Sequence, residues 1–225
     1  MKKEVKNILS IAVIIIIFIL ISFLIWDLLG INKGLKQKKL EEYQDDINLM
    51  IVAHPDDEIL WGSKELIEKK YLVVCITCGK DKTREHEIEE VLKLTGDDLI
   101  SLGYTDKFLG HKSKWVTEHK KIEKDIKKII NMKKWTNIVT HNEDGEYGHI
   151  HHKKIHNMVA STNADNIHYF GKYYTKKQIL NKNNLDDYKL DKQTLNTKKT
   201  ILRKYKSQDR VIKMFNHMIP YEDIK

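Results

Sequence analysis

The sequence has only two cysteines, Cys75 and Cys78, among its 225 residues. That number excludes a zinc site made of four cysteines. The C-x-x-C spacing still allows a redox pair or a zinc-binding pair. Because Cys75 lies inside the apolar run 71–77, ordinary packing at the end of a strand is the favoured interpretation.

The sequence also lacks an internal repeat, a low-complexity tract outside one apolar run near its start, and any nucleic-acid recognition motif. Its formal net charge is +8, and residues 171–206 contribute eleven Lys and Arg against three Asp. Without a recognition motif, this charge does not favour nucleic acid as a partner. It is typical of a solvated surface, and the alternative is contact with anionic lipid head groups, where each basic residue adds about 1 kcal/mol.

The apolar run covers residues 8–26 without a charged side chain, and its nineteen residues are about the length that crosses a bilayer. Lys2, Lys3 and Lys6 precede the run, as basic residues do in a signal peptide. However, the run exceeds the usual ~7–15 apolar residues of such a peptide, and no small-x-small cleavage site follows it. We therefore predict a transmembrane anchor in residues 1–30 of a single-pass membrane protein.

The orientation of this anchor is not determined by its flanks. Lysines stand on both sides of the run, so the positive-inside rule gives no firm answer. The absence of any N-x-[ST] sequon slightly favours the cytosolic face for the rest of the chain. Residues 31–46 are rich in charge and are predicted to be a linker, and residues 47–225 to be one folded domain.

From residue 47 onward, short apolar runs alternate with longer segments of helical period. The runs predicted to be strands are 47–52, 71–77, 137–140 and 167–170, with a weaker candidate at 107–109. The segments predicted to be helices are 58–70, 83–102, 117–132 and 149–161. This alternation predicts an α/β fold with a mostly parallel sheet and helices on both faces. In such sheets the ligand lies beyond the carboxyl ends of the strands.

Two polar clusters follow predicted strands. The first reads Ala-His-Pro-Asp-Asp-Glu over residues 53–58, and the second covers residues 140–156 and contains five histidines. Both open on the same edge of the sheet, although about 90 residues separate them. His54 and Asp57 stand three apart at a strand-to-helix turn, so both side chains can converge on one ion.

In the second cluster, His149, His152 and His156 share one helix face, whereas His151 points about 100° away. Two histidines and one carboxylate are typical of a catalytic zinc site, which leaves a fourth position for water. Asp56, next to a ligand but not needed as one, is the candidate base. The alternatives are a solvated histidine pair and an acidic helix N-terminus, and they leave the meeting of both clusters at one edge unexplained.

Together the A-H-P-D-D-E stretch and the later G-x-x-G-H-x-x-H pattern resemble the LmbE-like family. That family includes the N-acetylglucosaminyl-phosphatidylinositol de-N-acetylases (the PIG-L group) and bacterial deacetylases of glucosaminyl-inositol and glucosaminyl-malate. The resemblance covers roughly residues 47–215. Its supporting matches are Thr77-x-Gly79, Arg84-x-x-Glu87, Leu102-Gly103 and Tyr205-Lys-Ser-Gln208.

The resemblance implies a Rossmann-like fold and a zinc-dependent hydrolase that removes an N-acetyl group from a sugar. It implies that one zinc ion, or else another divalent transition metal, is bound by His54, Asp57 and His152. It further implies that Asp56 is the base, that His149 stabilises the oxyanion and helps protonate the leaving amine, that Tyr147 polarises the carbonyl, and that Arg84 contacts substrate. Some members carry Asp where this chain has His151, which leaves the protonation partner of His149 undetermined.

These observations predict a membrane-anchored de-N-acetylase acting on a glycoconjugate that contains N-acetylglucosamine, such as N-acetylglucosaminyl-phosphatidylinositol or another lipid-linked glycan. One alternative is a deacetylase of a soluble glucosaminide or a surface polysaccharide, because the conformation of the loops that select the sugar cannot be predicted from the sequence. A second is a non-catalytic glycan-binding module, although no ligand or base is missing. The sequence does not determine the oligomeric state.

Overall fold

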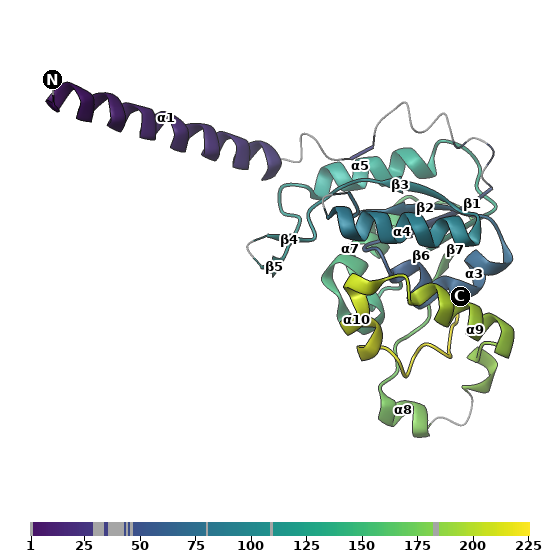
Figure 1. Cartoon of the computed structure of the whole chain (residues 1–225). Coiled ribbons are helices and arrows are strands. Elements are labelled where there is room, and N and C mark those ends of the chain that lie inside the picture. The colour runs from purple at the N-terminus through teal and green to yellow at the C-terminus, as the bar shows by residue number, and fades with distance from the viewer. Residues whose placement is uncertain are drawn as a thin grey trace.

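The computed structural model describes residues 2–28, 34–35, 43, 45, 47–79, 81–108, 110–181 and 185–225. Its first helix, α1 (Lys2–Leu28), contains an apolar stretch from Val5 to Ile25 with a mean hydropathy of 3.4. The side chains of residues 5–25 are all exposed, and Figure 1 shows α1 standing apart from the rest of the chain. A helix of this length and composition, close to the N-terminus, fits a membrane anchor and also a signal sequence.

The rest of the chain is built on a five-stranded sheet with the order β3-β2-β1-β6-β7. Its strands are β1 (Asn48–Val52), β2 (Leu72–Cys75), β3 (Asp98–Ser101), β6 (Asn137–Thr140) and β7 (Ile167–Tyr169). Every neighbouring pair in this sheet is parallel. The parallel α/β fold predicted from the sequence is therefore confirmed.

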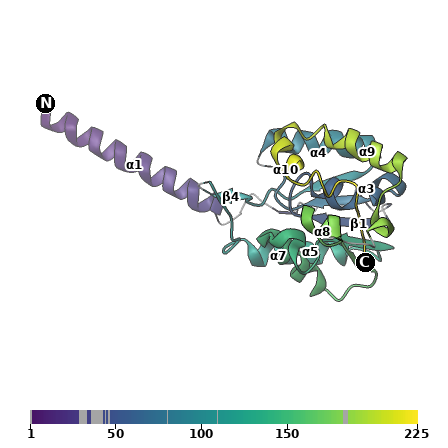
Figure 2. The same cartoon turned by 90° about the horizontal axis from the view of Figure 1, so that it is seen from below.

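Apolar side chains alternate between the two faces of β1, as they must when both faces are covered. Leu49 and Ile51 enter one core, and Met50 and Val52 enter the other. The helices of the first core are α5 (His119–Ile130) and α7 (Ile150–Ala160); those of the second are α3 (Asp57–Glu68), α4 (Lys82–Thr95) and α9 (Lys192–Leu202). Figure 2 shows α4 and α9 on one side of the sheet and α5 and α7 on the other.

Two predicted elements differ from the structure. The helix expected over 83–102 begins at Lys82, where Asp81 caps it by accepting from the backbone N–H groups of Thr83 and Arg84, and it ends at Thr95. Gly96 takes a left-handed conformation (φ 83°) that ends the helix, because its N–H bonds back to the Leu92 carbonyl. Residues 98–101 then form the edge strand β3, which was not predicted.

The weak strand candidate at 107–109 is not part of the main sheet. Lys107–Phe108 form β4, which pairs antiparallel with β5 (His111–Lys112) in a separate hairpin, and residue 109 lies outside the described residues. Short helices α6 (Gly145–Gly148), α8 (Lys176–Asn181) and α10 (Asp209–Met214) complete the fold, with 3₁₀ turns at 186–188 and 206–208.

Three described residues of the predicted linker contact the domain. The backbone N–H of Gly34 donates to the Leu102 carbonyl at 2.7 Å, and that of Leu35 donates to Asp125 Oδ2 at 2.9 Å. The Tyr43 hydroxyl donates to the Leu99 carbonyl at 3.3 Å. The domain limits at 30, 46 and 225 stay predictions, but among the described residues Gly34, Leu35 and Tyr43 are already bonded to the domain.

Candidate metal centre

The sheet brings the two polar clusters together, because β1 and β6 are adjacent and parallel and both clusters follow their carboxyl ends. Asp56 forms the turn between β1 and α3 with φ 117°, a backbone conformation that side chains other than glycine rarely adopt. Its backbone N–H donates to Glu58 Oε2 at 3.1 Å. The other oxygen of Glu58 accepts the Tyr205 hydroxyl, so the late Tyr205 motif supports this turn.

His54, Asp57 and His152 converge as the sequence predicted. His54 Nδ1 lies 3.1 Å from Asp57 Oδ2, and His152 Nε2 lies 3.3 Å from His54 Nδ1 and 3.4 Å from Asp57 Oδ2. Donors about 2.0–2.2 Å from a tetrahedrally bound ion lie roughly 3.3–3.6 Å apart, which is close to this triangle. All three residues are buried. The three side chains can therefore hold one metal ion.

Glu146 and His141 surround the far side of His152. Glu146 Oε2 accepts a hydrogen bond from His152 Nδ1 and lies 3.1 Å from His141 Nδ1. The N–H of Ala53 donates to His141 Nε2 at 2.9 Å, so the ring proton of neutral His141 is on Nδ1, facing Glu146. This carboxylate fixes His152 with its Nε2 lone pair toward the metal position, as in the carboxylate–histidine pairs of metal proteins.

Charges around this triangle favour a cation. Burial disfavours charge on His152, yet Asp57 and Glu146 raise its pKa to about 10. Burial likewise opposes the charged form of Glu146, but the His141 and His152 rings lower the pKa of Glu146 to about 2. In the metal-free chain the site thus attracts a proton, which a bound metal displaces.

Three overlapping groups of ligand-type side chains occur among the described residues. Besides the first triangle they are His141, Glu146, His152 and His54, His149, His151. The Ala53 N–H donates a hydrogen bond to His141 Nε2, and the His151 N–H donates one to His149 Nδ1 at 3.3 Å. These two ring nitrogens are therefore not available to a metal. Of these three groups, only the triangle of His54, Asp57 and His152 joins a carboxylate to two available nitrogens beside an open pocket.

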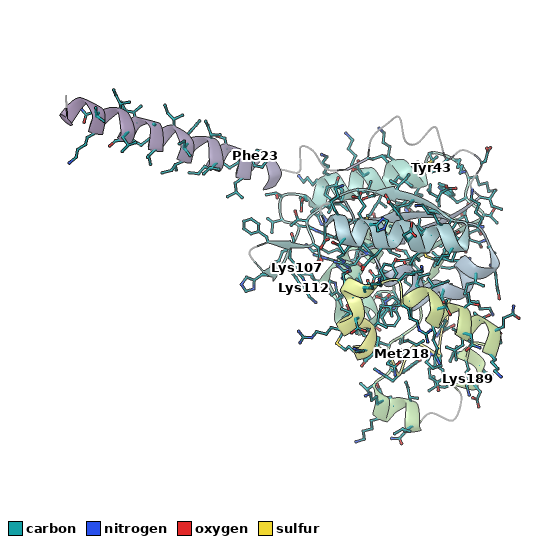
Figure 3. The ribbon with its side chains drawn as sticks, in the orientation of Figure 1. Phe23, Tyr43, Lys107, Lys112, Lys189 and Met218 are labelled. Carbon is teal, nitrogen blue, oxygen red and sulfur yellow. The ribbon has the colours of Figure 1, made fainter. Side chains whose placement is uncertain are left out.

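That pocket is lined by side chains from both clusters and from the hairpin β4–β5. Its polar lining consists of His54, Asp56, Asp57, Arg84, Asp106, Lys107, Lys112, Tyr147, His149 and Gln208. Leu60, Val211, Met214 and Phe215 form an apolar wall. Figure 3 shows Lys107 and Lys112 close together on the hairpin. Of the residues predicted for the site, all but the deeper His152 reach the pocket.

Asp56 lies beside the triangle without being part of it. Burial and the neighbouring Asp57 raise the pKa of Asp56 well above its usual range, and Arg84 opposes this shift from 4.0 Å. Arg84 is itself fixed, because it donates to the Pro55 carbonyl at 3.1 Å and to Asp106 Oδ2 at 2.8 Å. Arg84 therefore reaches the pocket already paired with Asp106, a partner that the sequence did not indicate.

His149 caps α7 from outside the helix (φ −68°, ψ 129°), and its Nδ1 accepts the His151 backbone N–H. The proton of the neutral ring is then on Nε2. Burial and then the His54 ring lower the pKa of His149 to about 2, and no carboxylate among the described residues forms an ion pair with it. Tyr147 lies next to it, with ring centroids 5.8 Å apart.

His151 lies elsewhere than its helical spacing predicted. His149 precedes α7 as its N-cap, and the adjacent residues His151 and His152 contact different ring nitrogens of His54, Nε2 and Nδ1 respectively. Their ring centroids are 5.2 Å and 5.3 Å from that of His54. The expectation that His151 points away from the site is therefore wrong.

Comparison with known proteins agrees with these motifs. Residues 49–163, half of the chain, match the model of the PIG-L family, described as GlcNAc-PI de-N-acetylase. The chain belongs to the PIG-L family. This matched range contains both polar clusters, and a de-N-acetylase-like function follows at the level of the family.

Two individual proteins are similar to this chain over most of its length. The chain is 31% identical over 193 residues to "Uncharacterized protein L374" of Acanthamoeba polyphaga mimivirus, and the match covers 76% of each chain. The crystal structure of the conserved protein TT1542 from Thermus thermophilus superposes with a TM-score of 0.54 at 14% identity. That superposition covers 79% of this chain and 92% of the other, and at this identity it supports the fold alone.

Proposed function

We propose that this PIG-L chain is a membrane-anchored, zinc-dependent hydrolase that removes the N-acetyl group from a glycoconjugate containing N-acetylglucosamine. The observation that carries the proposal is the convergence of His54, Asp57 and His152 beside a separate carboxylate, Asp56, on the wall of an open pocket. This arrangement supplies a metal position and a base within one site. A glycan-binding module has no use for the second carboxylate.

The metal would be held by His54 Nδ1, Asp57 Oδ2 and His152 Nε2. A zinc ion bound there supplies a Lewis acid that makes water nucleophilic near neutral pH and withdraws charge from the amide carbonyl. Two neutral nitrogens and one carboxylate suit zinc better than magnesium or calcium, which prefer oxygen donors.

Asp56 is the proposed general base. Its strained turn, fixed through Glu58, directs the carboxylate to the pocket and keeps it out of the triangle. Asp56 takes a proton from the attacking water as the new C–O bond forms. It then gives this proton to the amine nitrogen as the C–N bond breaks, which releases acetate and the free amino sugar.

His149 and Tyr147 are the proposed donors to the carbonyl oxygen. Because His149 Nδ1 accepts a backbone N–H, the Nε2–H of the ring is free to face the pocket. A neutral imidazole can donate this hydrogen bond to the carbonyl oxygen without transferring the proton. One donor to a developing oxyanion typically contributes about 2.7–4 kcal/mol. Burial raises the pKa of Tyr147 above its usual value, so its hydroxyl stays protonated and can donate as well.

The substrate is proposed to be lipid-linked, with the bilayer as the second partner of the chain. The apolar length of α1 supports an anchor, and Lys107 and Lys112 place positive charge at the mouth of the pocket. An enzyme held at the surface meets substrates confined there at a raised effective concentration. The face of the membrane and the oligomeric state are outside this proposal.

The test measures amine release by the zinc-loaded full chain reconstituted in vesicles. One substrate is N-acetylglucosaminyl-phosphatidylinositol in the same vesicles, and the other is a water-soluble N-acetylglucosaminide. We expect release from both, faster from the lipid, and loss with Asp56→Asn. Equal turnover of soluble substrate at matched concentration would favour the soluble glucosaminide, and no release from either would contradict the de-N-acetylase assignment.

A further inference from the structure

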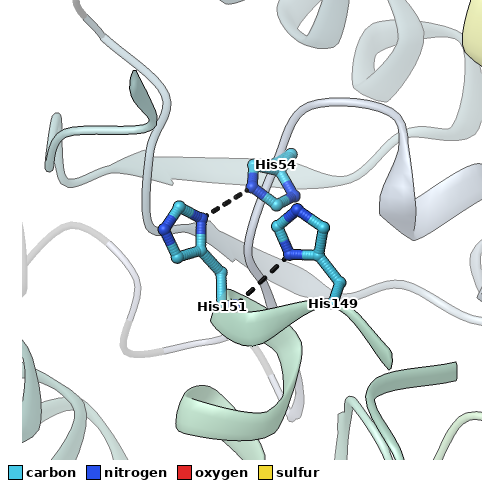
Figure 4. Close-up of side chains that lie close together, drawn as sticks. All are labelled: His54, His149 and His151. Atoms are coloured by element: carbon cyan, nitrogen blue, oxygen red, sulfur yellow. Dashed lines mark hydrogen bonds between the residues drawn. The ribbon is translucent and has the colours of Figure 1, made fainter. Parts of the chain in front are cut away.

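The two ring nitrogens of His54 face different partners. Nδ1 belongs to the metal triangle, 3.1 Å from Asp57 Oδ2, whereas Nε2 lies 3.0 Å from Nδ1 of His151. Figure 4 shows this second contact, which joins the loop after β1 to the first turn of α7. A neutral imidazole carries one proton on its two nitrogens. Only the tautomer with the proton on Nε2 leaves the Nδ1 lone pair of His54 for a metal.

The proton positions follow from a carbonyl at the far end. His151 Nε2 lies 2.6 Å from the Ser113 carbonyl oxygen, which can only accept, so the proton of His151 is on Nε2. In the neutral ring with its proton on Nε2, Nδ1 can only accept. The His54 Nε2 must therefore donate to it.

His151 is fixed in this orientation by more than one bond. The Trp115 ring stacks on it with centroids 4.0 Å apart and an interplanar angle of 4°. Trp115 is itself buried and donates Nε1–H to the Thr105 carbonyl at 2.7 Å. The second acceptor near His54 Nε2 is Asp106 Oδ1, which is farther away at 3.5 Å and paired with Arg84.

We infer that His151 is a positioning residue which, by accepting the Nε2–H of His54, fixes the tautomer that presents Nδ1 to the metal. The inference rests on the proposed metal site, whichever substrate the enzyme takes. It assigns a purpose to the histidine that this chain has where some relatives carry Asp. Partners of this kind, one step behind the ligands, typically change metal affinity by 10–100-fold.

The test compares two substitutions of nearly the same shape, His151→Asn and His151→Leu, in the full chain in detergent micelles. Both lose the bond to the Ser113 carbonyl, but Asn keeps an oxygen near the position of Nδ1 and Leu has no acceptor. With zinc affinity measured by chelator competition, we expect Asn to stay within about threefold of the unchanged chain and Leu to fall 10–100-fold. His119→Leu, on the exposed start of α5, is the control.

A second measurement does not depend on any variant. In the zinc-loaded chain with ¹⁵N-labelled histidine, a ¹⁵N–¹⁵N coupling through the hydrogen bond should connect His54 Nε2 with His151 Nδ1. Equal zinc affinity for the Asn and Leu variants, or a proton found on His151 Nδ1, would overturn the inference. Neither measurement uses an acetylated substrate. A failure of the proposed reaction would therefore leave these results unchanged, and the two outcomes can be distinguished.

Discussion

The backbone N–H of Ala53 donates to Nε2 of His141, and this 2.9 Å bond ties the end of β1 to the residue that follows β6. His141 in turn lies against Glu146, and its ring stacks on His152 with centroids 3.9 Å apart. The loop that carries His54, one proposed metal ligand, is thus bonded to His141, which packs against His152, another. Because of this bond between Ala53 and His141, the geometry of the site depends on the register of β1 against β6.

The first prediction concerns Glu146, the carboxylate behind His152. Glu146→Gln keeps the shape of the side chain but removes the charge that accepts His152 Nδ1–H and His141 Nδ1–H. We expect zinc affinity to fall by about 10–100-fold, measured by competition with a chelator. Glu143→Gln on the exposed part of the same loop is the matched control, and a parallel loss there would contradict a specific role for Glu146.

The second prediction separates the two adjacent aspartates. Asp56→Asn should keep stoichiometric zinc while kcat falls roughly 10²–10⁴-fold, because a general base typically contributes that much. Asp57→Asn should instead lose zinc, because the carboxylate of Asp57 is a proposed ligand. Metal content by mass spectrometry and turnover of a soluble N-acetylglucosaminide distinguish the two. Zinc loss in the Asp56 variant with full rate after reloading would mean that the roles are reversed.

The third prediction concerns the pH dependence of stability and uses Asp97, which directly precedes β3 and does not line the candidate site. Burial raises the pKa of Asp97 to about 6, and its Oδ2 has no hydrogen-bond partner among the described residues, while Oδ1 accepts the Tyr71 N–H. The pKa of Asp97 is therefore higher in the folded state than in the unfolded state. Its contribution to stability is complete below about pH 4 and is lost as the pH rises through 6. Asp97→Asn should therefore gain about 1–3 kcal/mol relative to the unchanged chain between pH 4 and pH 8.

Urea unfolding at several pH values measures this difference. Asp98→Asn, at the neighbouring position, serves as the control, because the side chain of Asp98 is 39% exposed and so lacks the burial that acts on Asp97. A stability difference between Asp97→Asn and the unchanged chain that does not vary with pH would show that the carboxyl group of Asp97 titrates normally in the folded state.

The fourth prediction concerns the residues between α1 and the sheet. A chain that begins at Lys33 keeps the contacts of Gly34 and Leu35, whereas one that begins at Asp45 loses them together with the Tyr43 bond. We expect both to fold and bind zinc, and the shorter one to unfold at a Tm several degrees lower. Each lost hydrogen bond contributes about 0.5–1.5 kcal/mol. Identical melting curves would mean that these contacts add nothing to stability.

The sequence was sufficient to predict the sheet and the meeting of the two clusters, because apolar runs of strand length alternate with helical segments. It failed at residues 98–101, where Asp98 and Ser101 leave a four-residue edge strand with little apolar pattern. The stop signal was present, since Gly96 is the type of residue that ends a helix in the left-handed conformation.

The residues that contact the proposed metal ligands could not be predicted from the sequence for a different reason. Glu146 was visible inside the second cluster, but only its position behind His152 reveals its role. For His151 the predicted helix begins one residue too early, because His149 caps α7 instead of belonging to it. Ser113 and Trp115 come from a loop that has no periodic pattern, so their contact with His151 depends entirely on tertiary structure.

The attachment of Gly34 limits how far the catalytic domain can stand from a membrane. Five residues separate the end of α1 at Leu28 from Gly34, and such a segment reaches at most about 20 Å. With α1 in the bilayer, as proposed, the edge of the domain near Leu102 cannot rise farther above the lipid than this reach allows. The enzyme would then stay next to the bilayer surface, which favours sugars attached directly to a lipid over residues far out on a long glycan.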